Sequence, residues 1–315
     1  MKLLVMGAGA LGAAAGGFLA KAGHEIHLVG REAPMRAISE QGLRITGIWG
    51  EHQVMNLHTH THVEALRGMV FDLILVAVKS YDTAEAATRI KPLISSDTLV
   101  CSYQNGLGNA ECIAEAVGWE RTIGARVIYG ARINQPGEVE ITVIAAPTAF
   151  GVYHAKTPVE TIHEIVRAMD DAGLPSVYTN NIQTVLWSKV AYNCALNPLS
   201  ALLDVPYGRL AECPDTRRIM DDAISELYHT AAAMRVPLEP ASADAYRDLF
   251  YTTLLPPTAA HYASMREDLR KGRRTEIDAL NGAIARFGAQ HGIACPANAM
   301  LTALIHAREQ YGGIG

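Results

Sequence analysis

Three polar side chains share one face of a predicted helix whose other residues are largely apolar. Lys189, Asn193 and Asn197 are spaced at i, i+4 and i+8, which keeps them on one stripe at about 100° per residue. Such a stripe is either buried against another helix with its hydrogen bonds satisfied, or it lines a cleft. Three donors in a cleft can hold a small anionic, oxygen-rich substrate. Pro198 follows directly, so we expect the helix to kink there and leave a backbone carbonyl free.

A glycine-rich turn near the start of the chain has the G-x-G-x-x-G pattern. Its residues are Gly7, Ala8, Gly9, Ala10, Leu11 and Gly12. An apolar strand precedes the turn, a small-residue helix follows, and a second strand covers 25–29, which is the context that makes the pattern specific. Gly7 permits the tight turn, Gly9 lets the backbone approach a pyrophosphate, and Gly12 lets the helix pack close to the strand. Together with the unpaired amides of the helix N-terminus, this predicts a nicotinamide dinucleotide site.

The residues after the second predicted strand indicate which dinucleotide binds. An NAD-binding chain usually has an acidic residue there, which hydrogen-bonds the ribose 2′-hydroxyl. This chain has Gly30-Arg31 instead, and the forked guanidinium suits a 2′-phosphate. Lys79, just after the predicted strand 72–78, is a second candidate cation, although both cations are also typical of solvated loops. NADP, as NADPH, is favoured over NAD, with Glu32 as the residue that would weaken this preference if it turned inward.

Strand and helix patterns alternate along the first half of the chain. The apolar runs 72–78 and 98–102 are typical of parallel strands that are buried on both faces. The alternation predicts a doubly wound parallel sheet, which the segments 122–128, 138–142 and 148–152 extend.

After about residue 180 the pattern changes to helices separated by prolines and turns. Helical patterns cover 182–203, 215–234, 241–255, 258–270, 276–291 and 297–311. We therefore predict an α/β protein in which an N-terminal Rossmann-type doubly wound sheet is followed by an all-helical C-terminal domain. The predicted NADP-binding domain is 1–180, and the predicted helical substrate and catalytic domain is 181–315.

Composition narrows the class of protein. The chain has 315 residues, of which 49% are hydrophobic and 19% charged, and its formal charge of -5 argues against a nucleic-acid or anionic-membrane partner. Glycines interrupt the apolar N-terminal run, which therefore predicts a strand, turn and helix rather than a secretory signal. Five widely spaced cysteines fit reduced thiols and a cytoplasmic location. The sequence leaves the oligomeric state open, with a homodimer as one option.

Three histidines alternate in the segment 58–62. On a strand, His58, His60 and His62 point to one face, where they could bind a metal adventitiously. No carboxylate or cysteine accompanies them at ligand spacing, so we expect a solvated strand face and no metal site.

Five separated motifs carry a resemblance to a known family. They are the glycine turn; Gln104-Asn105-Gly106-Leu107-Gly108; Trp187-Ser188-Lys189 through Asn193-Cys194 to Asn197-Pro198-Leu199; Ser264-Met265; and Thr275-Glu276-Ile277-Asp278 with Asn281-Gly282. In this order the chain resembles the ketopantoate reductase family (2-dehydropantoate 2-reductases) over nearly its whole length. The resemblance implies NADPH-dependent reduction of ketopantoate to pantoate, as in pantothenate biosynthesis.

The resemblance also implies roles for individual residues. Lys189 matches the family's catalytic lysine, which gives a proton to the ketone oxygen as the hydride arrives, and Glu276 matches its acidic partner. Asn105 matches the asparagine beside the nicotinamide. The positions expected to hold the substrate are Asn105, Asn193, Asn197 and Ser264. A nearby ammonium stabilises the negative charge that develops on the reduced oxygen and supplies its proton.

One position departs from the family pattern. His261 stands three residues before Ser264, where many members have an asparagine near the substrate. Its ring either donates an equivalent hydrogen bond or changes which 2-oxo acid fits. The second possibility leaves open a reductase of another small 2-oxo acid. A separate alternative is a non-catalytic NADP-binding redox sensor, against which Lys189 and Glu276 argue, because a sensor needs no proton donor.

Overall fold

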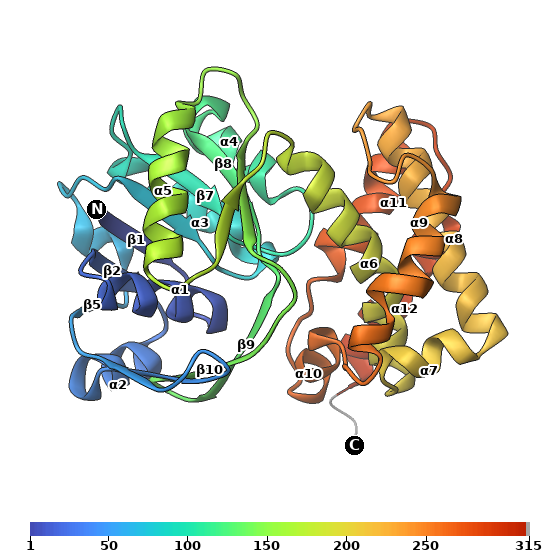
Figure 1. Ribbon diagram of the computed structural model, residues 1–315, viewed down its shortest axis with the longest axis horizontal. Coiled ribbons are helices and arrows are strands. Elements are labelled where there is room, and N and C mark those ends of the chain that lie inside the picture. Colours follow the sequence, from blue (N-terminus) through green and yellow to red (C-terminus); the bar gives the residue numbers. More distant parts are fainter. Residues whose placement is uncertain (313–315) are drawn as a thin grey trace. The chain divides into compact units, whose positions relative to one another are not determined.

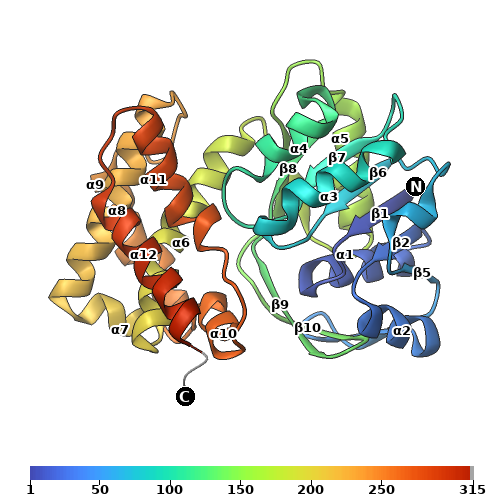
Figure 2. The same cartoon turned by 180° about the vertical axis from the view of Figure 1, so that it is seen from behind.

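The computed structural model describes residues 1–312, and internal contacts divide the chain into two compact units. The first unit comprises Met1–Gln104 and Asn109–Ile182. The second comprises Asn105–Gly108 and the chain from Gln183 onward. Figures 1 and 2 show both units from opposite sides. The short segment Asn105–Gly108 therefore belongs by its contacts to the helical unit, although the flanking chain on both sides belongs to the first unit.

The first unit contains an eight-stranded sheet that is mainly parallel. Its strands, in spatial order, are β12 (Ser176–Tyr178), β11 (Thr148–Val152), β8 (Thr122–Arg126), β7 (Leu99–Ser102), β6 (Leu73–Val76), β1 (Lys2–Met6), β2 (Glu25–Val29) and β5 (Leu57–His60). The order reverses beside β1, as in a doubly wound sheet. The predicted fold class is confirmed, except that β11 pairs antiparallel with β8.

Helices cover both faces of this sheet. Successive residues of a strand point to opposite faces, and in the central strands both sets of residues are apolar, so both faces must be buried. Leu3 and Val5 of β1 pack in one core with α1 (Ala10–Lys21) and α5 (Val159–Asp171). Leu4 and Met6 pack in the opposite core with α3 (Thr83–Ile90) and α4 (Asn109–Val117). Figure 1 shows α1 and α5 on the near side of the sheet, and Figure 2 shows α3 and α4 on the other. Two apolar faces explain why the strands have continuous apolar sequences.

A second sheet corrects part of the sequence prediction. Its four strands, in spatial order, are β4 (His52–Val54), β3 (Leu43–Gly47), β10 (Glu138–Ile144) and β9 (Tyr129–Gln135). Segment 138–142 was expected to extend the parallel sheet, but it pairs with β3 and β9 instead. Helix α2 (Glu32–Gln41) connects β2 to β3.

The second unit is helical. Its main helices are α6 (Ile182–Leu203), α7 (Tyr207–Glu212), α8 (Pro214–Ala233), α9 (Ala243–Leu249), α10 (Ser264–Arg270), α11 (Asn281–Gln290) and α12 (Pro296–Tyr311). Three predicted helices are shorter than expected: 241–255 ends in a π-helical turn over Phe250–Leu254, and 258–270 is helical only over α10. The predicted helix 276–291 begins with a separate 3-10 turn, Ile277–Ala279, before α11. Within residues 1–312, no helix combines the length and apolar character needed to span a membrane.

Candidate active site

The glycine-rich turn joins β1 to α1 with little room for side chains at two of its glycines. Gly7 has φ +109°, and a Cβ atom there would lie 2.5 Å from the backbone nitrogen of Val78. A Cβ atom on Gly12 would lie 2.2 Å from the carbonyl oxygen of Gly7. The amides of Gly7 and Ala8 both donate to the carbonyl of Val29 at 3.0 Å, which ties the turn to the end of β2. The turn is therefore fixed by backbone contacts that only glycine permits.

Gly9 differs from its neighbours because its side-chain direction is open. A Cβ atom at this position would have no atom of residues 1–312 within 4 Å. Gly9 is the N-cap of α1, and no side chain caps this helix. The amides of Ala10, Leu11 and Gly12 form the first turn, where a helix has no internal acceptors for its N–H groups. An open approach to unpaired amides at a helix N-terminus suits the pyrophosphate of a dinucleotide.

The two cations expected to select the cofactor lie at the carboxyl ends of the strands that flank β1. Arg31 is exposed and is the N-cap of α2, directly after β2. Glu32 is the first residue of the same helix and is also exposed. Lys79 is half-buried and precedes the 3-10 turn Ser80–Asp82 that follows β6. β2 and β6 are the two parallel neighbours of β1, so both cations occupy the sheet edge at which the turn lies.

In the helical unit, the predicted catalytic lysine contacts a predicted site asparagine. Lys189, in the second turn of α6, donates from Nζ to Oδ1 of Asn105 at 2.6 Å. Both residues are half-buried. The bond occupies one of the three donors of the ammonium. Motifs that are 84 residues apart in the chain are thus joined by one charge-assisted hydrogen bond.

A close backbone contact positions Asn105. The next residue, Gly106, has φ +88°, and a Cβ atom on it would lie 2.5 Å from the carbonyl oxygen of Ala279. The amide of Leu107 donates to that same carbonyl at 2.8 Å. The segment Asn105–Gly108 is therefore fastened to the 3-10 turn Ile277–Ala279, which explains why its contacts assign it to the helical unit.

Glu276 lies at the start of the same 3-10 turn. It is half-buried and is the N-cap residue of Ile277–Ala279, and its carbonyl accepts from the amide of Ala279 at 3.0 Å. Thr275 orders the approach to the turn, because its Oγ1 accepts from the amide of Ile277 at 3.3 Å. The contacts of Gly106 and Leu107 with Ala279 therefore join the segment that contains Asn105 to the short turn that Glu276 begins.

The proline inside α6 has a specific structural consequence. Pro198 has no amide hydrogen, so the carbonyl of Cys194, four residues earlier, lacks its helical donor. Asn281, which is fully buried, supplies the missing bond from Nδ2 to this carbonyl at 3.0 Å. Asn281 Nδ2 also donates to Oδ1 of Asn298 at 2.9 Å. The free carbonyl expected from the sequence exists, and a side chain from α11 satisfies it.

Asn197 and His261 lie on either side of a tyrosine that the sequence did not single out. Tyr207 donates from its hydroxyl to Oδ1 of Asn197 at 2.8 Å, and burial raises the pKa of this phenol, which keeps it protonated. The ring of His261 packs edge-on against Tyr207 with centroids 5.5 Å apart. Desolvation lowers the pKa of the His261 imidazole, which favours its neutral form. Tyr207 therefore links the site stripe of α6 to the position that departs from the family pattern.

The two remaining predicted site residues, Asn193 and Ser264, lie on different helices of the second unit. Asn193 is half-buried on α6, one turn after Lys189. Ser264 is exposed as the first residue of α10. The amide of Ala263, just before it, donates to Oγ of Ser200 on α6 at 3.3 Å, which fastens the start of α10 to the site helix.

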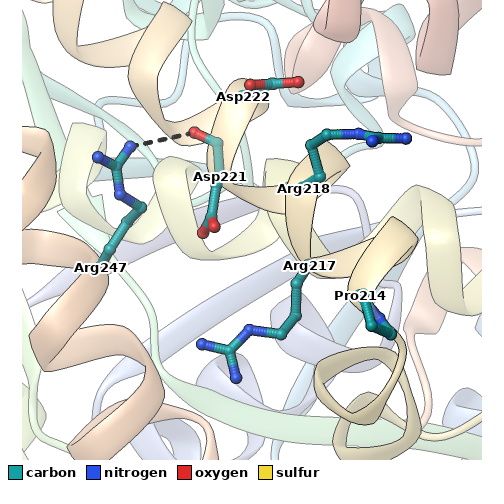
Figure 3. A pocket seen from close by; sticks show the side chains of 6 residues that line it. All are labelled: Pro214, Arg217, Arg218, Asp221, Asp222 and Arg247. Carbon is teal, nitrogen blue, oxygen red and sulfur yellow. Dashed lines mark hydrogen bonds between the residues drawn. The ribbon is translucent and has the colours of Figure 1, made fainter.

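A separate cavity on α8 and α9 contains none of these residues. It has a volume of about 550 Å³ and is lined by Pro214, Arg217, Arg218, Asp221, Asp222 and Arg247 (Figure 3). Its arginines have nearby partners: Arg218 pairs with Asp215 at 3.1 Å, and Arg217 stacks on the Tyr251 ring at 4.1 Å. The cavity is lined by both arginines and aspartates, and its arginines already interact with groups of the protein. It is therefore a poorer candidate than the predicted site for binding an anionic substrate.

Comparisons with known proteins identify the family of the chain. The family model "Ketopantoate reductase PanE/ApbA" matches residues 3–155, and its C-terminal counterpart matches residues 181–309. A 2-dehydropantoate 2-reductase from Aquifex aeolicus is 39% identical over 311 residues, which is 99% of this chain and 98% of the relative. One from Pyrococcus horikoshii is 34% identical over 99% of both chains.

Solved structures show the same relationship. A PanE/ApbA family ketopantoate reductase from Ralstonia eutropha JMP134 is 34% identical and superposes with a TM-score of 0.87 over 99% of this chain and 100% of the other. A D-mandelate dehydrogenase solved with NADH and anilino(oxo)acetate is 27% identical, with a TM-score of 0.87 over the whole of both chains. The chain belongs to the ketopantoate reductase family, whose members are pyridine-nucleotide-dependent reductases.

Proposed function

We propose that this protein catalyses the NADPH-dependent reduction of 2-dehydropantoate to pantoate. The observation that carries the proposal is the hydrogen bond between Lys189 and Asn105 in a chain that is 39% identical to a 2-dehydropantoate 2-reductase over nearly its full length. The bond holds an ammonium on a largely apolar helix, and an ammonium is the kind of group that can protonate the ketone oxygen.

The reaction adds a hydride to the ketone carbon and a proton to its oxygen, so that one C=O double bond becomes an alcohol. NADPH supplies the hydride when bound. Lys189 donates the proton from Nζ and stabilises the oxygen as it becomes negative. Asn105 holds the ammonium in place by accepting one of its hydrogens. Glu276, at the start of the 3-10 turn onto which Asn105 is fastened, acts as the acidic partner of the lysine.

Substrate binding is assigned to the polar groups that lie along and beside α6. Asn193, Asn197 and Ser264 supply hydrogen bonds to the carboxylate and hydroxyl oxygens of the substrate. Tyr207 holds Asn197 by its Oδ1, which leaves the amide nitrogen of Asn197 as the group directed at an oxygen of the substrate. His261 occupies the remaining position, and in its neutral form it can either donate or accept a hydrogen bond.

The cofactor preference is assigned to the residues after β2. Gly7, Ala8, Gly9, Ala10, Leu11 and Gly12 bind the pyrophosphate, and Asn105 lies beside the nicotinamide. Arg31, where an NAD-dependent chain usually has a carboxylate, pairs with the 2′-phosphate, and Lys79 adds positive charge at the same sheet edge. The cytoplasmic location and the homodimer remain predictions from the sequence.

A second candidate is a reductase of a bulkier 2-oxo acid. The D-mandelate dehydrogenase whose structure superposes on this chain was solved with NADH, and His261 marks a change at a predicted substrate position. Under this alternative, a phenyl-substituted 2-oxo acid would be reduced faster than 2-dehydropantoate, and NADH would replace NADPH.

The catalytic assignment is tested with Lys189→Ala. We expect kcat to fall by about 10²–10⁴, the usual contribution of a positioned proton donor, while the Kd for NADPH stays within about twofold. Lys271→Ala, which removes an exposed lysine at the end of α10, is the control and should retain wild-type turnover. Wild-type turnover in the Lys189 variant would refute the assignment.

A further inference from the structure

Four side chains on two adjacent strands of the first unit form a cluster of metal-binding types. Glu25 and His27 alternate along β2, and His58 and His60 alternate along β5, so all four point to one face of the sheet. The parallel register places His27 opposite His58. We call these four residues the edge cluster, because β5 is the last strand of the sheet.

The side chains of the edge cluster are in direct contact. His27, which is 3% exposed, has its Nε2 3.0 Å from Oε1 of Glu25 and its Nδ1 3.0 Å from Nε2 of His60. The rings of His27 and His58 stack with centroids 4.7 Å apart. One ligand atom each of Glu25, His27 and His58 lies within 4.8 Å of the other two.

We propose that Glu25, His27 and His58 bind a divalent transition-metal ion, with Zn²⁺ as the best fit, and that His60 is the hydrogen-bond partner that orients His27. Two imidazoles, one carboxylate and a water complete the tetrahedral set that zinc prefers. Bonds of about 2.0–2.2 Å require donor atoms roughly 3.3 Å apart. Glu25 Oε1 and His27 Nε2 already lie 3.0 Å apart, so only the more distant ligand atoms must approach, by at most roughly 1.5 Å. Glu25 and His58 are exposed and can make this rotation, while buried His27 is the fixed point.

The hydrogen bonds of His27 are arranged to support this ligand set. A carboxylate can only accept hydrogen bonds, so His27 donates from Nε2 to Oε1 of Glu25, 3.0 Å away. Nδ1 of His27 then accepts from His60. When Nε2 binds a metal, the bond between the two rings reverses, and Nδ1 donates to His60. A ligating histidine that donates its other ring N–H to a neighbour is the usual arrangement in metal sites.

One cation opposes metal binding. The ammonium of Lys2 lies 3.0 Å from the same Oε1 of Glu25, so a metal ion must displace it. This competition gives the proposal a directional consequence. Removing the Lys2 charge should tighten metal binding, whereas removing a ligand should weaken it.

The sequence alone did not predict this site, because the histidine segment 58–62 has no carboxylate at ligand spacing along the chain. The carboxylate comes from the neighbouring strand, more than 30 residues earlier in the chain, and only the pairing of β2 with β5 brings it to the histidines. His62, the third histidine of the alternating segment, lies beyond β5 and is not a member of the group.

The test is a calorimetric titration of Zn²⁺ into the EDTA-treated, nucleotide-free full-length protein. We expect one saturable site, weakened about tenfold or more in His58→Asn and Glu25→Gln, unchanged in His62→Asn, and tightened in Lys2→Gln. At the same Zn²⁺ concentration, the Tm of the wild type should rise more than that of His58→Asn. The absence of a saturable site, or equal losses in His58→Asn and His62→Asn, would overturn the proposal. Circular dichroism of each variant shows that a lost site is not a lost fold, and His58 and Glu25 are exposed enough for folding to survive.

Discussion

A substitution at Gly9 should change cofactor binding without changing the stability of the fold. The reason is that residues 1–312 leave empty space where a side chain at this position would point. In Gly9→Ala the new methyl group meets no atom within 4 Å, and φ of -75° suits alanine. The lower entropy of the unfolded chain stabilises the variant by about 0.4–1 kcal/mol. Alanine is a poorer N-cap than glycine, which offsets this gain. We expect the free energy of unfolding to stay within about 1 kcal/mol of the wild type.

The same methyl group lies where the pyrophosphate approaches the first turn of α1. Accommodating an extra methyl in a close contact costs about 1–3 kcal/mol, which weakens NADPH binding by about 5–150-fold. Gly12→Ala is the matched comparison, because its Cβ atom would lie 2.2 Å from a backbone oxygen of the protein itself. That variant should lose about 1–3 kcal/mol or more of stability before any cofactor is added.

Both variants are measured by fluorescence titration with NADPH and by urea unfolding at 25 °C. The reasoning predicts that Gly9→Ala loses affinity at unchanged stability and that Gly12→Ala loses stability. A wild-type Kd for NADPH in Gly9→Ala would show that the pyrophosphate does not lie against Gly9. A large loss of stability in Gly9→Ala would show that, in solution, other atoms of the protein occupy the space beside Gly9.

Three further perturbations follow from single contacts. Arg31→Ala should raise the KM for NADPH about tenfold or more and leave the KM for NADH nearly unchanged, and equal changes for both cofactors would exclude a 2′-phosphate contact. Gly106→Ala, whose Cβ atom would lie 2.5 Å from the Ala279 carbonyl, should displace Asn105 and reduce kcat more than NADPH affinity, as steady-state kinetics would reveal. Asn281→Leu should cost about 1–3 kcal/mol of stability by leaving the Cys194 carbonyl without a donor. In a Pro198→Ala background, the new backbone amide at position 198 can donate to the Cys194 carbonyl, so Asn281→Leu should lower the free energy of unfolding by about 1 kcal/mol less than it does in the wild type. Urea unfolding of both single variants and of the double variant measures this difference. Strictly additive effects of the two substitutions would contradict the role given to Asn281.

The fold class could be predicted because it depends on local patterns. The glycine turn between an apolar strand and a helix, and the change to helical periodicity near residue 180, are readable from short windows of sequence. The place of 138–144 could not be predicted, since an alternating strand pattern does not state which sheet the strand joins. The 3-10 turn at Ile277–Ala279 was also missed, because its conformation depends on the backbone contact with Gly106 and Leu107.

The site shows the same division between local and distant information. Pro198 indicated that a carbonyl in α6 lacks a donor, but the donor comes from Asn281, 87 residues beyond Cys194. The stripe of Lys189, Asn193 and Asn197 was apparent from its spacing, whereas Tyr207 as the partner of Asn197 was not. A tyrosine after a proline carries no sequence signal of its own, and only its hydrogen bond to Asn197 in the folded protein gives it a role.

The most direct test of the proposed activity is a comparison of kcat/KM for purified protein with 2-dehydropantoate and with other 2-oxo acids, each with NADPH and NADH. The account predicts the highest kcat/KM for 2-dehydropantoate with NADPH, and loss of that turnover in Lys189→Ala. A higher kcat/KM for a phenyl-substituted 2-oxo acid with NADH would contradict the proposed substrate and cofactor. An absence of NADPH oxidation with every 2-oxo acid would contradict the enzymatic role itself.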